Sequence, residues 1–185
     1  MQEAVYQLNL QRHSEGLPLI RAGIGMHTGP LIMGITGDEH RLDAATISDT
    51  VNTAARIESL TKYYGSPLLL SGETLQLITE LNKYQFRHLG KVLLKGKNNL
   101  LSIVECMNGN SEEARNKKIK TIPQFNKAMH CYQEQQFEHA ISLFQDILAI
   151  DPEDHTATIF MHKALKYLKN GAPENWTGAE EMLSK

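Results

Sequence analysis

The chain has 185 residues, of which 41% are hydrophobic and 22% charged, and its hydrophobic residues are spread along it, so collagen-like and largely disordered proteins are excluded. Lys and Arg total 19 against 21 Asp and Glu, a formal net charge of -2, which argues against a general nucleic-acid-binding protein. The two cysteines, Cys106 and Cys131, are too far apart for a disulfide scaffold or a Cys-based zinc site. No apolar run is long enough for a membrane segment and the N-terminus is no secretory signal, so we expect a cytoplasmic protein.

The first 107 residues predict a mixture of helices and strands. Apolar spacing predicts helices over residues 1–14, 49–64 and 73–81. Short apolar runs predict strands over residues 17–24, 30–35, 42–47, 68–70, 86–94 and 100–106, with a hairpin-type turn at 95–99. Such a mixture indicates an α+β fold in which helices cover a sheet.

The composition changes after residue 107. Residues 108–121 are polar, contain a cluster of Lys and Arg, and have few large apolar side chains, which predicts a linker. Residues 122–185 are helical in pattern, with helices expected over 123–135, 137–150 and 154–169.

The spacing of five residues within this helical part resembles the 34-residue tetratricopeptide repeat (TPR), a pair of antiparallel helices. These residues are Ala128, Phe137, Ala140, Phe144 and Pro152. Because one repeat cannot bury its apolar face alone, we expect this TPR-like hairpin to dock on the α+β part or on another chain.

The helix expected over 49–64 has two polar residues on one face. At about 100° per residue, Ile57 and Tyr64 lie on one side and Asn52 and Arg56 on the other, one turn apart. Asn can orient a sugar oxygen, and Arg presents a fixed fork of donors suited to phosphate oxygens. For an arbitrary Asn and Arg at this spacing, a solvated helix face is the commoner explanation.

Asn52 and Arg56 belong to the second of three motifs that follow one another along the chain. The motifs are Gly23-Ile-Gly-Met-His-Thr-Gly-Pro30, Val51-Asn-Thr-Ala-Ala-Arg-Ile-Glu58 and Leu94-Lys-Gly-Lys97. Together they resemble the second half of a class III adenylate or guanylate (nucleotidyl) cyclase catalytic domain, over about residues 1–107. The resemblance implies a partial ferredoxin-like cyclase domain without its first strands, followed by the all-α TPR-like hairpin.

The resemblance also implies the reaction, in which ATP or GTP is converted to a 3′,5′-cyclic nucleotide and pyrophosphate in intracellular signalling. Asn52 matches the family's ribose-orienting Asn, and Arg56 matches its transition-state Arg. Lys95 matches the lysine that reaches the terminal phosphates. Ala45 stands where many members have the Asp or Thr that reads the base, so the choice between adenine and guanine stays open.

The family's two metal-holding aspartates belong to strands upstream of this sequence, and Asp38, Asp43 and Asp49 are not substitutes by position. Mg²⁺ or Mn²⁺ would be bound in the complete enzyme by ligands that are not in this chain. We therefore expect a fragment of a larger cyclase that is inactive alone. Ser48, where a Gly is common, is expected only to cap the helix.

Family sites lie at a dimer interface, so the expected partner is a second copy or a complementary cyclase subunit. The alternative is a non-catalytic module that dimerises through the cyclase-like part and binds a peptide or protein through the TPR-like tail. Gly23, Gly25 and Gly29 have the wrong spacing for a dinucleotide-binding loop and are expected to permit tight turns or close backbone approach. His27 is expected to be a hydrogen-bonded structural residue.

Overall fold

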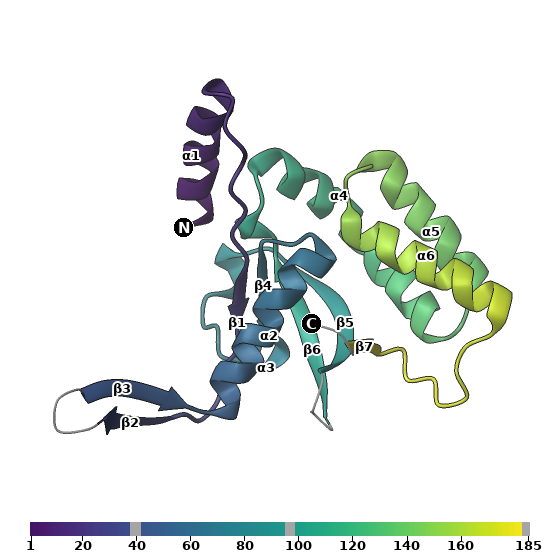
Figure 1. The fold of residues 1–185 in the computed structure, drawn as a ribbon. Helices are drawn as coiled ribbons and strands as arrows, with labels where there is room; N and C mark the ends of the chain where they lie inside the picture. The colour runs from purple at the N-terminus through teal and green to yellow at the C-terminus, as the bar shows by residue number, and fades with distance from the viewer. Residues whose placement is uncertain (38–41, 95–98, 183–185) are drawn as a thin grey trace.

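The fold comes from a computed structural model that describes residues 1–37, 42–94 and 99–182, with only the backbone of residues 35–37 and 42–47 (Figure 1). Its helices are α1 Gln2–Ser14, α2 Asp49–Tyr64, α3 Gly72–Gln76, η1 Leu81–Lys83, η2 Met107–Gly109, α4 Glu112–Gln133, α5 Phe137–Ile150 and α6 His155–Asn170. Its strands are β1 Ile24–Met26, β2 Ile32–Gly37, β3 Leu42–Ile47, β4 Leu68–Ser71, β5 Phe86–Leu94, β6 Leu100–Cys106 and β7 Glu180–Met182.

Five of these strands form one sheet in the order β1-β4-β6-β5-β7. The pairs β1–β4 and β5–β7 are parallel, whereas β4–β6 and β5–β6 are antiparallel. β2 and β3 form a separate antiparallel hairpin that projects from the body of the molecule (Figure 1). The expected mixed α+β architecture is therefore present.

The two faces of the sheet follow the alternation of side chains along each strand. Leu69 and Ile103 point into the larger hydrophobic core, which also contains buried side chains of α2. Their neighbours Leu70 and Val104 belong to a smaller cluster on the other face, where Leu75 of α3 packs against them. α2 therefore lies on the sheet face that has the main core.

The helical tail shares that core. Phe125 of α4, Phe144 of α5 and Phe160 of α6 are buried in the same cluster as the sheet residues Leu89 and Val92. The tail thus docks on the α+β part of its own chain, which is one of the two arrangements expected for a hairpin that cannot bury its apolar face alone.

Three segments differ from their sequence-based predictions. Residues 17–23 form no strand, because the side-chain amide of Asn9 bonds both the N–H and the C=O of Ile20, at 2.8 and 2.7 Å. The helix expected over 73–81 ends at Gln76. β7 was not expected at all. The turn expected at 95–99 lies mostly outside the described residues.

The predicted linker is the fourth difference, since α4 begins at Glu112 inside it. The hydroxyl of Ser111 caps this helix by accepting the N–H of Ala114, and two glutamates occupy its first turn. Lys118, on the inner side of the helix, is buried. The basic residues of this segment therefore lie on a packed helix rather than on an extended tether.

Candidate functional site

The helix that carries the candidate site, α2, has defined signals at both ends. The Ser48 hydroxyl accepts the N–H of Val51 at 3.1 Å, so Ser48 caps the helix as expected. Gly65 ends it in the left-handed conformation, with φ of +64°. Ile57 and Tyr64 are buried against the sheet, as the helical spacing predicts.

α2 lies unusually close to β1, and two glycines permit this approach. A Cβ at Gly25 would lie 2.1 Å from the backbone nitrogen of Glu58 and 2.5 Å from the carbonyl oxygen of Ala54. A Cβ at Gly23 would lie 2.0 Å from Oγ1 of Thr61. The expectation of close backbone approach at the glycine-rich motif is thus confirmed at Gly25, whereas Gly23 makes room for the side chain of Thr61.

Asn52 and Arg56 both lie on the side of α2 that faces away from the core. Asn52 is exposed and Arg56 is partly buried. Ser59, which continues the same face, donates its hydroxyl to the Ala55 carbonyl at 3.1 Å and so is bonded within its own helix. The exposed carboxamide and the partly buried guanidinium therefore lie one turn apart along the same side of the helix, as the i, i+4 spacing predicts.

The hydrogen bonding of the Arg56 guanidinium is unusual. Its Nη1 atom is buried, yet it has no hydrogen-bond partner within the described part of the chain. A buried donor without a partner costs free energy, on the order of 1–3 kcal/mol. A phosphate or another anion reaching this atom would remove that cost.

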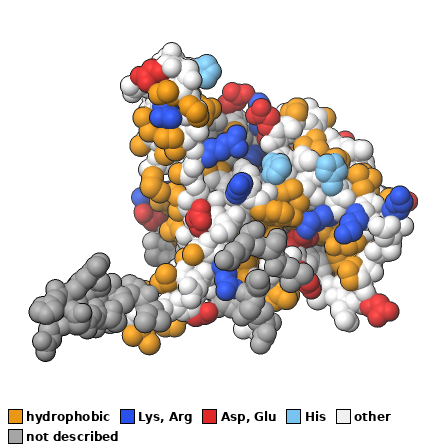
Figure 2. Space-filling view, viewed as in Figure 1, with side chains coloured by type: hydrophobic (Ala, Val, Ile, Leu, Met, Phe, Trp, Pro, Cys, Tyr) orange, Lys and Arg blue, Asp and Glu red, His pale blue; other side chains and the backbone are white. Residues whose placement is uncertain are grey.

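An apolar surface adjoins the first turn of α2. The hydroxyl of Thr50 donates to the carbonyl of Pro30 at 2.6 Å and fixes the base of the β2–β3 hairpin against the helix. Around this base, large hydrophobic side chains are exposed and gather at the edge of the undescribed grey atoms (Figure 2). The exposed large hydrophobic residues nearest the Thr50–Pro30 contact in the sequence are Leu31, Ile32, Met33 and Val51.

Two of the predicted site residues are not placed. Lys95 lies outside the described residues. Ala45 is described only by its backbone, which pairs with Gly34 across the hairpin. The roles expected for Lys95 at the phosphates and for Ala45 at the base remain predictions.

His27, within the glycine-rich motif, is a structural residue. Its Nδ1 lies 2.8 Å from Oγ of Ser71, the N-cap of α3, and Thr28 lies 3.1 Å from Thr74 on the same helix. These contacts attach the end of β1 to α3. Sequence reasoning did not identify Ser71 and Thr74, although a Ser directly before a helix is a recognisable N-cap signal.

The described ranges contain no group of three or more His, Cys, Asp or Glu side chains that could hold a metal ion. Those ranges therefore offer no such group for the Mg²⁺ or Mn²⁺ that the resemblance implies. Within the same ranges, no helix is long and apolar enough to cross a membrane.

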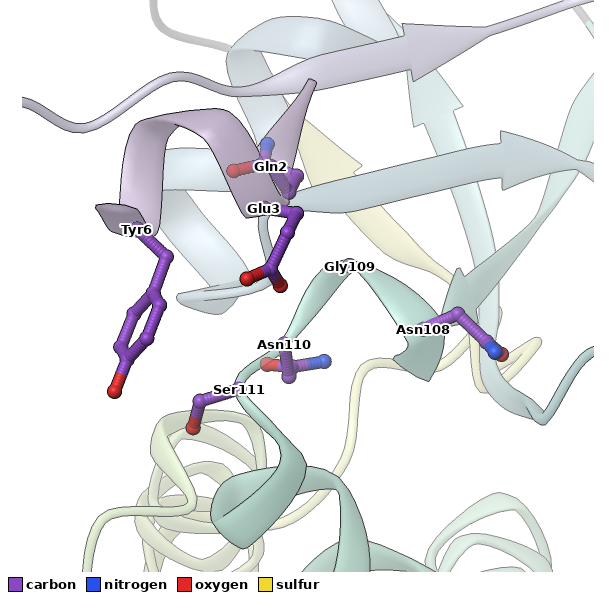
Figure 3. Close-up of a pocket in the computed structure, with 7 residues that line it drawn as sticks. All are labelled: Gln2, Glu3, Tyr6, Asn108, Gly109, Asn110 and Ser111. Atoms are coloured by element: carbon purple, nitrogen blue, oxygen red, sulfur yellow. The ribbon is translucent and has the colours of Figure 1, made fainter. Parts of the chain in front are cut away.

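A small pocket of about 70 Å³ lies elsewhere, between α1 and the segment that follows β6 (Figure 3). It is lined by Gln2, Glu3, Tyr6, Asn108, Gly109, Asn110 and Ser111. Neither Asn52 nor Arg56 lines it, so it is separate from the candidate site on α2.

Comparison with known proteins assigns the family. The family model described as the adenylate and guanylate cyclase catalytic domain matches residues 1–106, more than half of the chain. The chain belongs to this family.

Two curated relatives are adenylate cyclases. The chain is 32% identical over 151 residues to the terminal-differentiation specific adenylate cyclase of Dictyostelium discoideum, covering 81% of this chain and 7% of that protein. It is 38% identical over 110 residues to an adenylate cyclase of Anabaena cylindrica, covering 57% and 22%. The chain thus spans less than a quarter of the length of either relative.

Among solved structures, the adenylyl cyclase CyaB from P. aeruginosa is 27% identical to this chain, with a TM-score of 0.48. The match covers 57% of this chain and 52% of that one.

Proposed function

We propose that this chain is the C-terminal half of a nucleotide cyclase that converts ATP or GTP to a 3′,5′-cyclic nucleotide and pyrophosphate. The observation that carries the proposal is the pair Asn52 and Arg56, one turn apart on the outer side of α2, with a buried guanidinium nitrogen that lacks a partner in the described residues. The family match over residues 1–106 supplies the reaction class.

In the proposed reaction the ribose 3′-oxygen attacks the α-phosphorus, the new P–O bond closes the ring, and pyrophosphate leaves. Asn52 holds the ribose for in-line attack through its carboxamide. Arg56 stabilises the negative charge that develops on the α-phosphate, and Lys95 stabilises the departing pyrophosphate. A divalent ion would come with ligands from outside this chain, so these roles are limited to binding, orientation and charge stabilisation.

We propose further that the site is completed across a subunit boundary, by a second copy or by a complementary cyclase subunit. The exposed side chains of Leu31, Ile32 and Met33 lie beside the helix that carries Asn52, and Val51 extends this apolar surface onto α2. Exposed apolar surface of this kind is typical of protein interfaces. A partner packed there would lie next to the proposed nucleotide site.

A mixing experiment tests the proposal. The purified chain is assayed with ATP and with GTP in the presence of Mn²⁺, alone and together with a cyclase subunit that retains its metal-binding aspartates but lacks the Asn and Arg pair. We expect no cyclic product from either protein alone and product from the mixture. Absence of product from the mixture, together with absence of nucleotide binding in calorimetry, would contradict the proposal.

The second candidate is a non-catalytic dimerisation and peptide-binding module, with residues 122–185 as its TPR-like part. The consecutive helices α4, α5 and α6 packed in one core favour it. Peptide binding by a chain that binds no nucleotide and yields no cyclic product in the mixture would select this candidate.

A further inference from the structure

The last described residues, 171–182, form an extended segment that returns from α6 to the sheet, and we call it the C-terminal strap. It ends in β7, which pairs in parallel with the last residues of β5, Val92 opposite Glu180 and Leu94 opposite Met182 (Figure 1). The strap thus covers both the helical tail and the outer edge of the sheet.

Trp176 is the aromatic anchor of the strap. Its ring lies edge-on to three rings of the helical tail, with centroid distances of 5.2 Å to Tyr132, 5.7 Å to Phe137 and 5.0 Å to Tyr167. Its indole N–H donates to the carbonyl of Gln133 at 2.8 Å. Each helix of the tail contributes one of the three rings.

Glu180 is the polar anchor, four residues further on. Its carboxylate is buried, accepts the hydroxyl of Tyr132 at 2.9 Å and forms an ion pair with Lys163 of α6. Between α6 and β7 the strap has no regular secondary structure, and most of its residues, including Pro173, Glu174 and Asn175, are exposed. Apart from Ala172, which packs against the main core, and Gly178, which is buried against Gln133, the contacts of the strap are concentrated at Trp176 and at the short strand that begins with Glu180.

The surface beneath the strap does not depend on it. Tyr132 and Phe137 are held by the helical core, where the Tyr132 ring also packs edge-on against Phe160 at 5.4 Å. β5 is paired along its other edge with β6. The aromatic rings of the helical tail thus lie next to the edge of β5 that β7 occupies, and proteins bind extended peptides in such settings by β-strand addition.

We propose that the helical tail and the edge of β5 form a peptide-binding site, and that the C-terminal strap is its exchangeable ligand. The site takes an extended peptide with a Trp four residues before a Glu that opens a parallel strand. In this chain the strap occupies the site in cis, so a peptide of that pattern binds only by displacing it. This inference does not depend on the cyclase reaction.

The chain contains a single tryptophan, so fluorescence reports the strap directly. In the intact chain, emission from Trp176 should be blue-shifted, and acrylamide should quench it several-fold less than in a free peptide of residues 171–182. An excess of the same peptide with Trp176→Phe should displace the strap and raise the quenching of the chain towards that of the free peptide. Quenching that stays at its starting value at saturating peptide concentrations would overturn the proposal.

Binding in trans is measured with the double variant Trp176→Ala, Glu180→Lys, which has no tryptophan and an emptied site. Adding the wild-type peptide should produce a saturable blue shift, and the Glu180→Lys peptide should bind at least about tenfold more weakly because it loses both polar contacts. Equal affinity of the two peptides, or no blue shift with a variant whose circular dichroism is unchanged, would overturn the proposal.

Discussion

Arg87 of β5 and Asp154 at the start of α6 form a fully buried ion pair between two parts of the chain that lie 67 residues apart. The guanidinium donates twice to the carboxylate, Nη1 to Oδ2 at 2.5 Å and Nη2 to Oδ1 at 3.3 Å. It also bonds Glu105 of β6 and lies 4.3 Å from the centre of the Phe125 ring of α4. One side chain therefore joins the sheet to two helices of the tail, and the two parts should unfold together.

The first prediction concerns this junction. Asp154→Asn keeps the side-chain oxygen that caps α6 through the Ala157 N–H but removes the negative charge. Because Arg87 retains Glu105, we expect a loss near the lower end of the range for breaking a buried ion pair, about 3 kcal/mol. Urea denaturation followed by circular dichroism measures this loss.

The matched control is Glu80→Gln, which removes an exposed ion pair with Lys83 and should cost less than about 1 kcal/mol. If Asp154→Asn were no more destabilising than this control, the buried pair would not be needed to hold the tail on the sheet.

The second prediction concerns acid stability. Burial alone would raise the pKa of Glu105, but the charges of Arg87 and Lys118 and the hydrogen bonds from Lys118 and Asn110 outweigh it and lower the pKa from 4.5 to about 2. A carboxylate whose pKa is lower in the folded state stabilises the fold above its ordinary pKa. That contribution, on the order of 3 kcal/mol, is lost as the pH falls from about 5 to about 2.

Urea denaturation of the wild type and of Glu105→Gln at pH 7, 5 and 3 measures this effect. The difference in unfolding free energy between the two proteins should shrink as the pH falls. Glu113→Gln, which removes a solvent-exposed pair with Lys117, should follow the wild-type pH dependence. A constant difference between the wild type and Glu105→Gln would exclude the assigned role of Glu105.

The buried charges also explain which parts of the fold the sequence could predict. Strands 86–94 and 100–106 and helices 49–64 and 137–150 were predicted from apolar spacing, and the structure has all four within these bounds. Most of their apolar positions point to the core, so hydrophobic periodicity located them, although it did not indicate the buried charges Arg87 and Glu105.

Periodicity fails where charged or polar groups make the packing contacts. The first half of α4 is poor in apolar residues because Lys118 packs inward to bond Glu105 at 2.5 Å, so its composition is that of a linker. β7 contains two glutamates, and Glu180 is buried only because Tyr132 and Lys163 lie opposite it in the folded chain. Pairings between such distant residues leave no local signal in the sequence.

For the candidate site, the sequence predicted the shared face of Asn52 and Arg56, because i, i+4 spacing on a well-capped helix determines it. It also predicted that the glycines permit close approach. It could not predict that the guanidinium of Arg56 is partly buried with a nitrogen that has no partner among the described residues, because this depends on tertiary packing around α2.

The third prediction tests Arg56 in the active mixture of subunits. Arg56→Ala should lower kcat by about 10²–10³-fold, because a donor aimed at developing charge contributes about 2.7–4 kcal/mol to the transition state. Arg56→Lys should restore only part of the rate, since an ammonium group cannot reproduce the fork of the guanidinium. Steady-state assays of cyclic product measure both variants.

Ser59→Ala is the matched control, because Ser59 lies on the same helical face but is bonded to its own helix. Its kcat should equal that of the wild type. If Arg56→Ala turned over at the wild-type rate, Arg56 would not stabilise the transition state of the proposed reaction.

The fourth prediction concerns the apolar surface at the base of the β2–β3 hairpin. Ile32 is 76% exposed and Met33 is 72% exposed, so a charge at Ile32 adds no burial cost in the isolated chain. In an assembled pair the same charge would be desolvated, and Ile32→Glu should therefore weaken association at least about tenfold. Sedimentation velocity measures this association for the chain alone and for its mixture with the complementary subunit. Leu77→Glu, at a residue that is 66% exposed just after α3, should leave association unchanged. If Ile32→Glu and Leu77→Glu behaved alike, the hairpin base would not be the interface, and the proposed nucleotide site would have to be completed from another side of α2.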